Sequence, residues 1–199
     1  MPRKHVALIL VEGETEEVFY KRLSEEKLGG IPKQIRNMKG NFNINNKIVD
    51  KCKQYSDSHP NNSFDVYVCV DRERVGMPVY NKALVDEKIN AIRGFGIKVD
   101  IIAELMIESL FFIDIHNIYA QLRTPKNQRY PKRYKNFRGL THKDMSRLFE
   151  KNGKQYYKGI KCEFLVKNLD LDLIIGGASE LGLLVGTVKA RHNKFNMAK

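Results

Sequence analysis

Carboxylate side chains follow three apolar runs of the sequence, and they are the residues best suited to chemistry. These acids are Glu12, Asp71 with Glu73, and Glu104 followed by Glu108. Carboxylates repel one another when they gather, and a hard cation relieves that repulsion because its preferred ligands are oxygens. We therefore expect a Mg²⁺ site, with Mn²⁺ as an alternative occupant. Such a site can activate water and polarise a phosphoryl group.

The residues around Glu12 have a spacing that suits a phosphate. Gly13 follows Glu12 and permits a tight turn, with close approach of the backbone to a ligand. Glu16 then falls in the first turn of an expected helix, whose N-terminus offers backbone N–H donors to an anion. Further along, Asp71 and Glu73 can converge on one ion once the chain turns.

The apolar runs before these acids predict strands, and helical patterns lie between them. Residues 5–12 and 64–70 are nearly continuous in aliphatic and β-branched side chains, which is typical of strands buried on both faces. Further strands are expected at 33–38 and 97–103, and helices at 14–28, 44–55, 81–93 and 107–122. This alternation predicts an α/β fold with a mostly parallel sheet flanked by helices. The carboxyl ends of parallel strands lie along one edge, so the acids should meet there.

The character of the chain changes after Leu122. We expect an α/β domain over 1–122, and over 123–199 a basic segment plus a helical C-terminal extension packed on the same domain. Residues 141–191 carry the helical pattern.

Residues 123–139 form the basic segment, which we expect to be a long loop. They hold seven Lys or Arg and no acid, within a chain of net charge +12. Cations meet phosphates, and aromatic rings stack on unpaired bases. The candidate nucleic-acid contacts are Arg129, Lys132, Arg133, Lys135 and Arg138, beside the aromatic residues Tyr130, Tyr134 and Phe137.

Three segments resemble TOPRIM domains. Residues 10–16 (LVEGETE) resemble the VEGxTE signature, and Asp71-Arg72-Glu73 is similar to the later acidic pair, which is usually DxD. Residues 107–112 (IESLFF) resemble a segment of small stand-alone TOPRIM proteins related to the overcoming-lysogenization-defect (OLD) nucleases and the RloB group. The resemblance covers roughly residues 5–115 and implies a TOPRIM-like sheet.

The resemblance also implies roles for the acids. Glu12 and Glu16 would hold metal, with Glu12 as a possible general acid/base, Asp71 and Glu73 would be the second pair, and Glu108 would lie at the edge of the site. Glu73 departs from the aspartate of many TOPRIM domains, which puts a strict two-metal geometry in doubt. Related nucleases often add a lysine, for which Lys158, Lys161 and Lys189 are candidates. Many such proteins act with an ABC/SMC-type ATPase in bacterial anti-phage defence. This sequence has no GxxxxGK[ST] phosphate loop, so an ATPase would act in trans.

Three functions follow as alternatives. The first is a Mg²⁺-dependent TOPRIM nuclease that cleaves DNA or RNA, tRNA included. The second is a nucleic-acid-binding module that holds metal without cleaving. The third is a regulatory subunit of the ATPase. We also expect a cytoplasmic protein without a membrane span, because no run approaches the roughly 18 apolar residues that a span needs and no secretion signal is visible. A homo-oligomer is possible.

Overall fold

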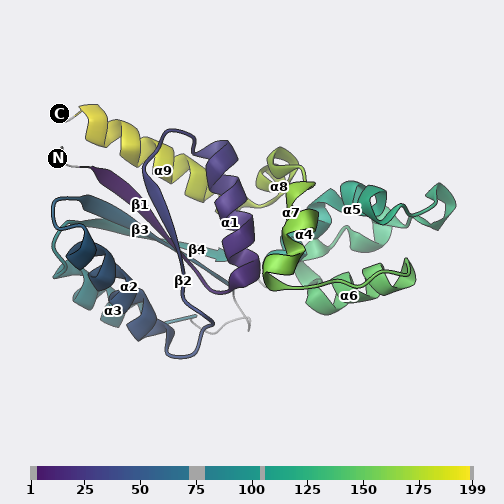
Figure 1. Cartoon of the computed structure of the whole chain (residues 1–199), viewed down its shortest axis with the longest axis horizontal. Helices are drawn as coiled ribbons and strands as arrows, with labels where there is room; N and C mark the ends of the chain where they lie inside the picture. Colours follow the sequence, from purple (N-terminus) through teal and green to yellow (C-terminus); the bar gives the residue numbers. More distant parts are fainter. Residues whose placement is uncertain (1–3, 72–78, 104–105, 198–199) are drawn as a thin grey trace.

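The computed structural model describes residues 4–71, 79–103 and 106–197, and it shows a sheet with helices on both faces beside a helical lobe (Figure 1). The strands are β1 His5–Val11, β2 Lys33–Asn37, β3 Ser63–Asp71 and β4 Phe95–Ala103. The helices against the sheet are α1 Glu14–Lys27, α2 Ile44–Ser58, α3 Lys82–Asn90 and α9 Ser179–Met197. Within these residues the four strands are all parallel, which confirms the predicted α/β class and sheet type.

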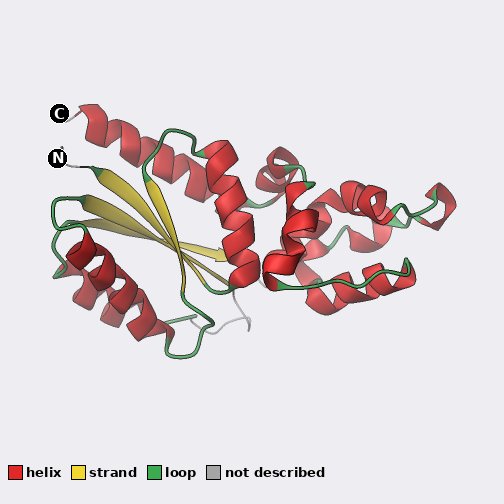
Figure 2. Ribbon diagram, viewed as in Figure 1, coloured by secondary structure: helices red, strands yellow, loops and turns green. Residues whose placement is uncertain are grey.

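β1 and β3 are central strands that are covered on both faces. Successive side chains of a strand point to opposite faces. Along β1, Ile9 and Val11 therefore belong to the core on one face, and Leu8 and Leu10 to the core on the other. Helices α1 and α9 cover the first face, and α2 and α3 cover the second (Figure 2). This two-sided burial explains the continuous apolar runs.

The strand order β2-β1-β3-β4 places β1 and β3 side by side. The chain leaves β1 toward β2 through α1, and then returns across the sheet to β3 through α2. The order of strands therefore reverses between β1 and β3, which is where open α/β sheets bind ligands. Val11 is paired with Cys69 in this register, so Glu12 and Asp71 emerge from neighbouring strand ends.

The helical lobe is built from short elements. Its helices are α4 Ile107–Phe111, α5 Ile115–Leu122, α6 His142–Lys151, α7 Glu163–Lys167 and α8 Leu171–Gly177. Single 3₁₀ turns join them, namely η1 Phe112–Asp114, η2 Lys126–Gln128, η3 Pro131–Tyr134, η4 Phe137–Gly139 and η5 Gly159–Cys162. The predicted basic loop thus contains three such turns.

The helix expected over 107–122 is divided at Asp114. The Asp114 carboxylate accepts a hydrogen bond from the backbone N of Asn117 at 3.4 Å, and so caps a new helix. Its other oxygen accepts from the backbone N of Asp170 at 2.6 Å. A long-range contact therefore fixes the break, which local pattern alone does not show.

The C-terminal helix α9 returns to the sheet. Leu181, Leu184 and Val188 join the same core cluster as Ile9 of β1. At the opposite end of the sheet from the acids, Arg191 donates hydrogen bonds of 2.7 and 3.0 Å to the buried Asp65. Residues from both sides of position 122 therefore share one core.

No single helix of the described residues is both long and apolar enough to cross a membrane. Only α8 and α9 taken together pass that test, and a bend of 106° separates them.

Candidate functional site

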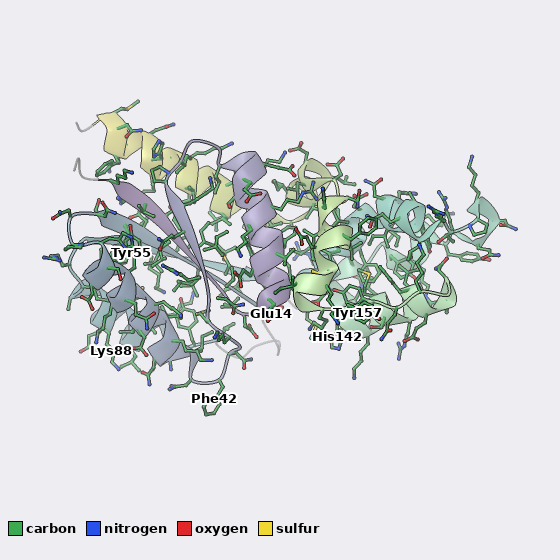
Figure 3. The ribbon with its side chains drawn as sticks, viewed as in Figure 1. Glu14, Phe42, Tyr55, Lys88, His142 and Tyr157 are labelled. Atoms are coloured by element: carbon green, nitrogen blue, oxygen red, sulfur yellow. The ribbon has the colours of Figure 1, made fainter. Side chains whose placement is uncertain are left out.

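A cleft of about 360 Å³ lies at the carboxyl ends of β1 and β3. Its charged lining consists of Glu12, Glu14, Glu16, Asp71 and Lys158. Figure 3 shows Glu14 at the end of α1 that borders the helical lobe. The cleft thus combines residues from two strand ends, the first turn of α1 and the loop before η5.

The turn after β1 brings Glu12 and Glu16 into the cleft. The Gly13 backbone passes so close to Glu16 that a Cβ at this position would lie 2.9 Å from Glu16 Oε2. The backbone oxygen of Glu12 accepts a hydrogen bond of 2.7 Å from the N of Gly40, in the loop between β2 and α2. A side chain at position 13 would therefore require the Glu16 carboxylate to shift.

Asp71 is held at the end of β3 by the start of α4. Its Oδ2 accepts a hydrogen bond of 3.1 Å from the backbone N of Ile107. This contact leaves the other carboxylate oxygen as a possible ligand for a cation. Glu73 and Glu104, together with Arg72, lie outside the described residues.

Glu108 is buried behind the cleft, with 1% of its side chain exposed. Lys158 Nζ lies 3.4 Å from Glu108 Oε1, and the Tyr156 hydroxyl donates to the same oxygen at 3.5 Å. The sequence left Glu108 between a site residue and an exposed helix residue, and the structure places it in the interior beside the other acids.

Four carboxylates act on one another electrostatically, namely those of Glu12, Glu16, Asp71 and Glu108. Burial, together with the charges of Glu108 and Glu12, raises the pKa of Glu16 to about 7, although Lys158 opposes the shift. Burial and the charges of Glu16, Glu12 and Glu108 raise the pKa of Asp71 well above its usual value. A bound cation would relieve this repulsion, and the oxygen-only donor set suits Mg²⁺.

The carboxylates of Glu12, Glu16 and Asp71 share the cleft but do not converge on one point. Among the described residues, no group of three or more His, Cys, Asp or Glu side chains is arranged to hold a metal ion. Side-chain rotation toward a cation is needed before Glu12, Glu16 and Asp71 could share it.

Lys158 is the lysine among the described cleft-lining residues, and sequence reasoning could not single it out. It was one of three candidates, and the others lie elsewhere: Lys161 sits over the Tyr157 ring at 5.1 Å, and Lys189 is on α9. The backbone N of Gly159 donates a hydrogen bond of 2.8 Å to Thr15 Oγ1, which fixes the loop that carries Lys158. No local pattern around Lys158 signals this contact.

The basic segment does not line the acidic cleft. Lys132, Arg133 and Lys135 are exposed on or beside η3. Arg129 and Arg138 contact other parts of the protein. Arg129 Nε donates to the backbone oxygen of Thr124 at 2.8 Å, and Arg138 Nη1 lies 3.7 Å from Glu180 Oε1.

The aromatic residues of that segment differ in accessibility. Tyr134 is buried and stacks on Phe112 at 5.0 Å, so the expectation that it offers a free ring to a base is wrong. Phe137 packs against the same core, whereas Tyr130 is 65% exposed. Apolar contacts with α4 and α5 bury the rings of Tyr134 and Phe137. The sequence could not predict this burial, because the spacing of aromatic residues in a loop does not reveal what they pack against.

Comparisons with protein-family models, with curated proteins and with solved structures gave no match to this chain.

Proposed function

We propose that this protein is a Mg²⁺-dependent nuclease that acts on nucleic-acid phosphodiesters in the cytoplasm. One observation carries the proposal: acids from β1, α1, β3 and α4 gather with one lysine at the point where the strand order reverses. Buried acids alone repel one another, and a divalent cation together with Lys158 would offset much of their negative charge.

Four residues of the cleft have a role in this proposal. Glu12 and Asp71 hold the cation from neighbouring strand ends, and Glu16 completes the ligand set from the first turn of α1. A Mg²⁺ ion bound there would polarise a phosphoryl oxygen and lower the pKa of a water molecule. Lys158 stabilises negative charge that develops on the phosphate. Glu12 is the candidate general acid/base. Glu73, two residues after Asp71, is a further candidate ligand.

A second function is favoured by the absence of a converged three-acid group in the described residues. In this second function the cleft binds nucleic acid through a cation but does not position the cation for cleavage. Action with an ABC/SMC-type ATPase in anti-phage defence, as nuclease or as regulatory subunit, is a further proposal that rests on the TOPRIM resemblance.

The test is cleavage of plasmid, linear duplex, single-stranded DNA and total tRNA in Mg²⁺, Mn²⁺ or EDTA. Asp71→Asn and Glu12→Gln should abolish products, while the matched control Asp57→Asn, on the exposed side of α2, should not. Metal-dependent products that persist in both cleft variants would place the chemistry elsewhere. Substrate binding without any product from the wild type would support the non-cleaving module.

A further inference from the structure

Two adjoining pockets of about 210 and 560 Å³ lie on the helical lobe, between α5, the segment before η5, and α7. They share Gln121, Lys154 and Phe164. Arg123 lines one pocket and Lys161 the other, and neither pocket has an Asp or Glu among its described lining residues. The two pockets therefore form a cationic surface, which we call the α5–α7 groove.

Two aromatic rings are accessible in this groove. Phe164 is 72% exposed and Tyr157 is 45% exposed. Lys161 Nζ lies 5.1 Å from the centre of the Tyr157 ring. Lys154 Nζ donates a hydrogen bond of 2.9 Å to the backbone oxygen of Gln121, which holds this lysine in the groove. Cations beside exposed rings form the combination that binds unpaired bases and their phosphates.

One stretch of chain joins the groove to the acidic cleft. Tyr157 lines the groove, and the next two residues, Lys158 and Gly159, line the cleft. Residues 152–158 run from α6 toward η5 as a non-helical segment (Figure 2), and Gly159, the next residue, lies against the Glu14 side chain at the cleft. A strand bound along this segment would lead directly to Lys158.

We propose that the α5–α7 groove binds single-stranded nucleic acid. Bases stack on Phe164 and Tyr157, while Arg123, Lys154 and Lys161 contact phosphates. A duplex keeps its bases stacked inside, so it cannot reach these rings. The cationic lining favours a polyanion over an apolar protein partner. This inference deepens the proposed function and rests on it for the delivery of the strand to the acidic cleft.

The experiment measures fluorescence anisotropy of labelled oligothymidylate and oligouridylate in EDTA, so that binding is read without cleavage. Phe164→Ala should weaken binding about 5- to 150-fold, the range expected for loss of one stacked base. Phe164→Tyr should retain binding, whereas Phe164→Leu, which stays apolar, should lose it. Lys161→Gln should reduce the slope of log affinity against log salt by about 0.7. Thermal melting confirms that each variant is folded.

Two controls define the location. Leu183→Ala removes a half-exposed apolar side chain of α9, and Tyr130→Ala removes the exposed ring of the basic segment. Leu183→Ala should leave binding unchanged, and Tyr130→Ala, in the basic segment that the sequence also offers to nucleic acid, should weaken it less than Phe164→Ala does. An effect of Tyr130→Ala with none from Phe164→Ala would overturn the proposal, as would a wild type that binds no oligonucleotide or binds a duplex equally well. Retention of full oligonucleotide binding in Phe164→Leu would also overturn it, because leucine offers no ring on which a base can stack.

The two proposals fail in different ways. A wild type that binds through Phe164 but never cleaves would support the groove proposal and contradict the nuclease proposal. A wild type that cleaves with Mg²⁺ while Phe164→Ala binds normally keeps the nuclease and removes the groove.

Discussion

Thr15 Oγ1 accepts a hydrogen bond of 2.8 Å from the backbone N of Gly159, across 144 positions of the sequence. Thr15 is buried in the first turn of α1, one residue before Glu16, and Gly159 follows Lys158. The bond therefore ties the acidic turn to the loop that supplies the positive charge. In this way the N-terminal part of the chain positions a lysine of the C-terminal part.

Thr15→Val should lower cleavage mainly through kcat, because the loss of this acceptor leaves the loop free to move Lys158. It also leaves a buried N–H without its acceptor, which should cost about 1–3 kcal/mol of unfolding free energy. Steady-state kinetics and urea unfolding measure both effects. Thr15→Ser keeps the oxygen and should restore kcat, and Thr187→Val on α9 is the matched control.

Lys158→Ala should reduce kcat by roughly 10²- to 10³-fold, the usual effect of losing one group that stabilises transition-state charge. Oligonucleotide binding should change far less. Lys189→Ala, an exposed lysine of α9, should leave kcat unchanged. If both variants cleave equally well, Lys158 has no catalytic role.

The sequence predicts the central part of this architecture well. The apolar runs of β1 and β3 leave no alternative to buried strands, and their terminal acids must then share an edge. The position of Lys158 could not be predicted, because it depends on the contact of Thr15 with Gly159. The same limit applies to Tyr134 and Asp114, whose partners Phe112 and Asp170 are fixed by tertiary packing.

Without metal, stability should fall as the pH rises from about 5 to about 8. The pKa of Glu16 is about 7 in the folded protein and near 4.5 when unfolded, so only the folded state holds the proton in this interval. The stabilisation that protonated Glu16 provides is complete below pH 4.5 and is lost as the pH rises through 7. This loss lowers the free energy of unfolding by roughly 3 kcal/mol. Asp71 acts in the same direction.

Calorimetry in EDTA across this range tests the effect. Glu16→Gln should flatten the decline, which separates it from histidine titration. Mg²⁺ should raise Tm more at high pH than at low pH, since ligands bind metal when deprotonated. A Tm of the metal-free protein that does not fall between these pH values would contradict the raised pKa of Glu16.

Gly159→Ala should cost more than Gly153→Ala, although both glycines have a left-handed φ, of 69° and 66°. Each substitution should lose about 1–2 kcal/mol through backbone conformation. Only at Gly159 does a new Cβ meet another side chain, 2.4 Å from Glu14 Oε2, whereas nothing lies within 4 Å at Gly153. Urea unfolding gives the difference, and Glu14→Ala in the Gly159→Ala background should recover it.

Arg191→Gln should destabilise the fold by roughly 3 kcal/mol, because Asp65 is buried and loses its charged partner on α9. Burial alone would raise the pKa of Asp65, but hydrogen bonds from His5 and Arg191 lower it to about 2. The stabilisation from the ionised Asp65 carboxylate is fully present above about pH 3.8 and is lost as the pH falls toward 2. Arg191→Gln should therefore be most costly near neutral pH. Acid titration of both proteins by circular dichroism measures this.

Arg147→Gln is the control for that comparison. Arg147 is 69% exposed and its Nη1 lies 3.6 Å from Asp144, so its removal should change stability by less than about 1 kcal/mol. Equal losses in the two variants would show that α9 is not held by Asp65.

The position of α9 has a consequence for synthesis. It packs on the same face of the sheet as Ile9 of β1, so that face is closed only after residues 179–197 have left the ribosome. Until then α1, which follows β1 directly, can cover only part of that face. Lys158 also emerges late, so a growing chain carries the acids long before their lysine. The complete cleft can exist only after Lys158 and Gly159 have been synthesised.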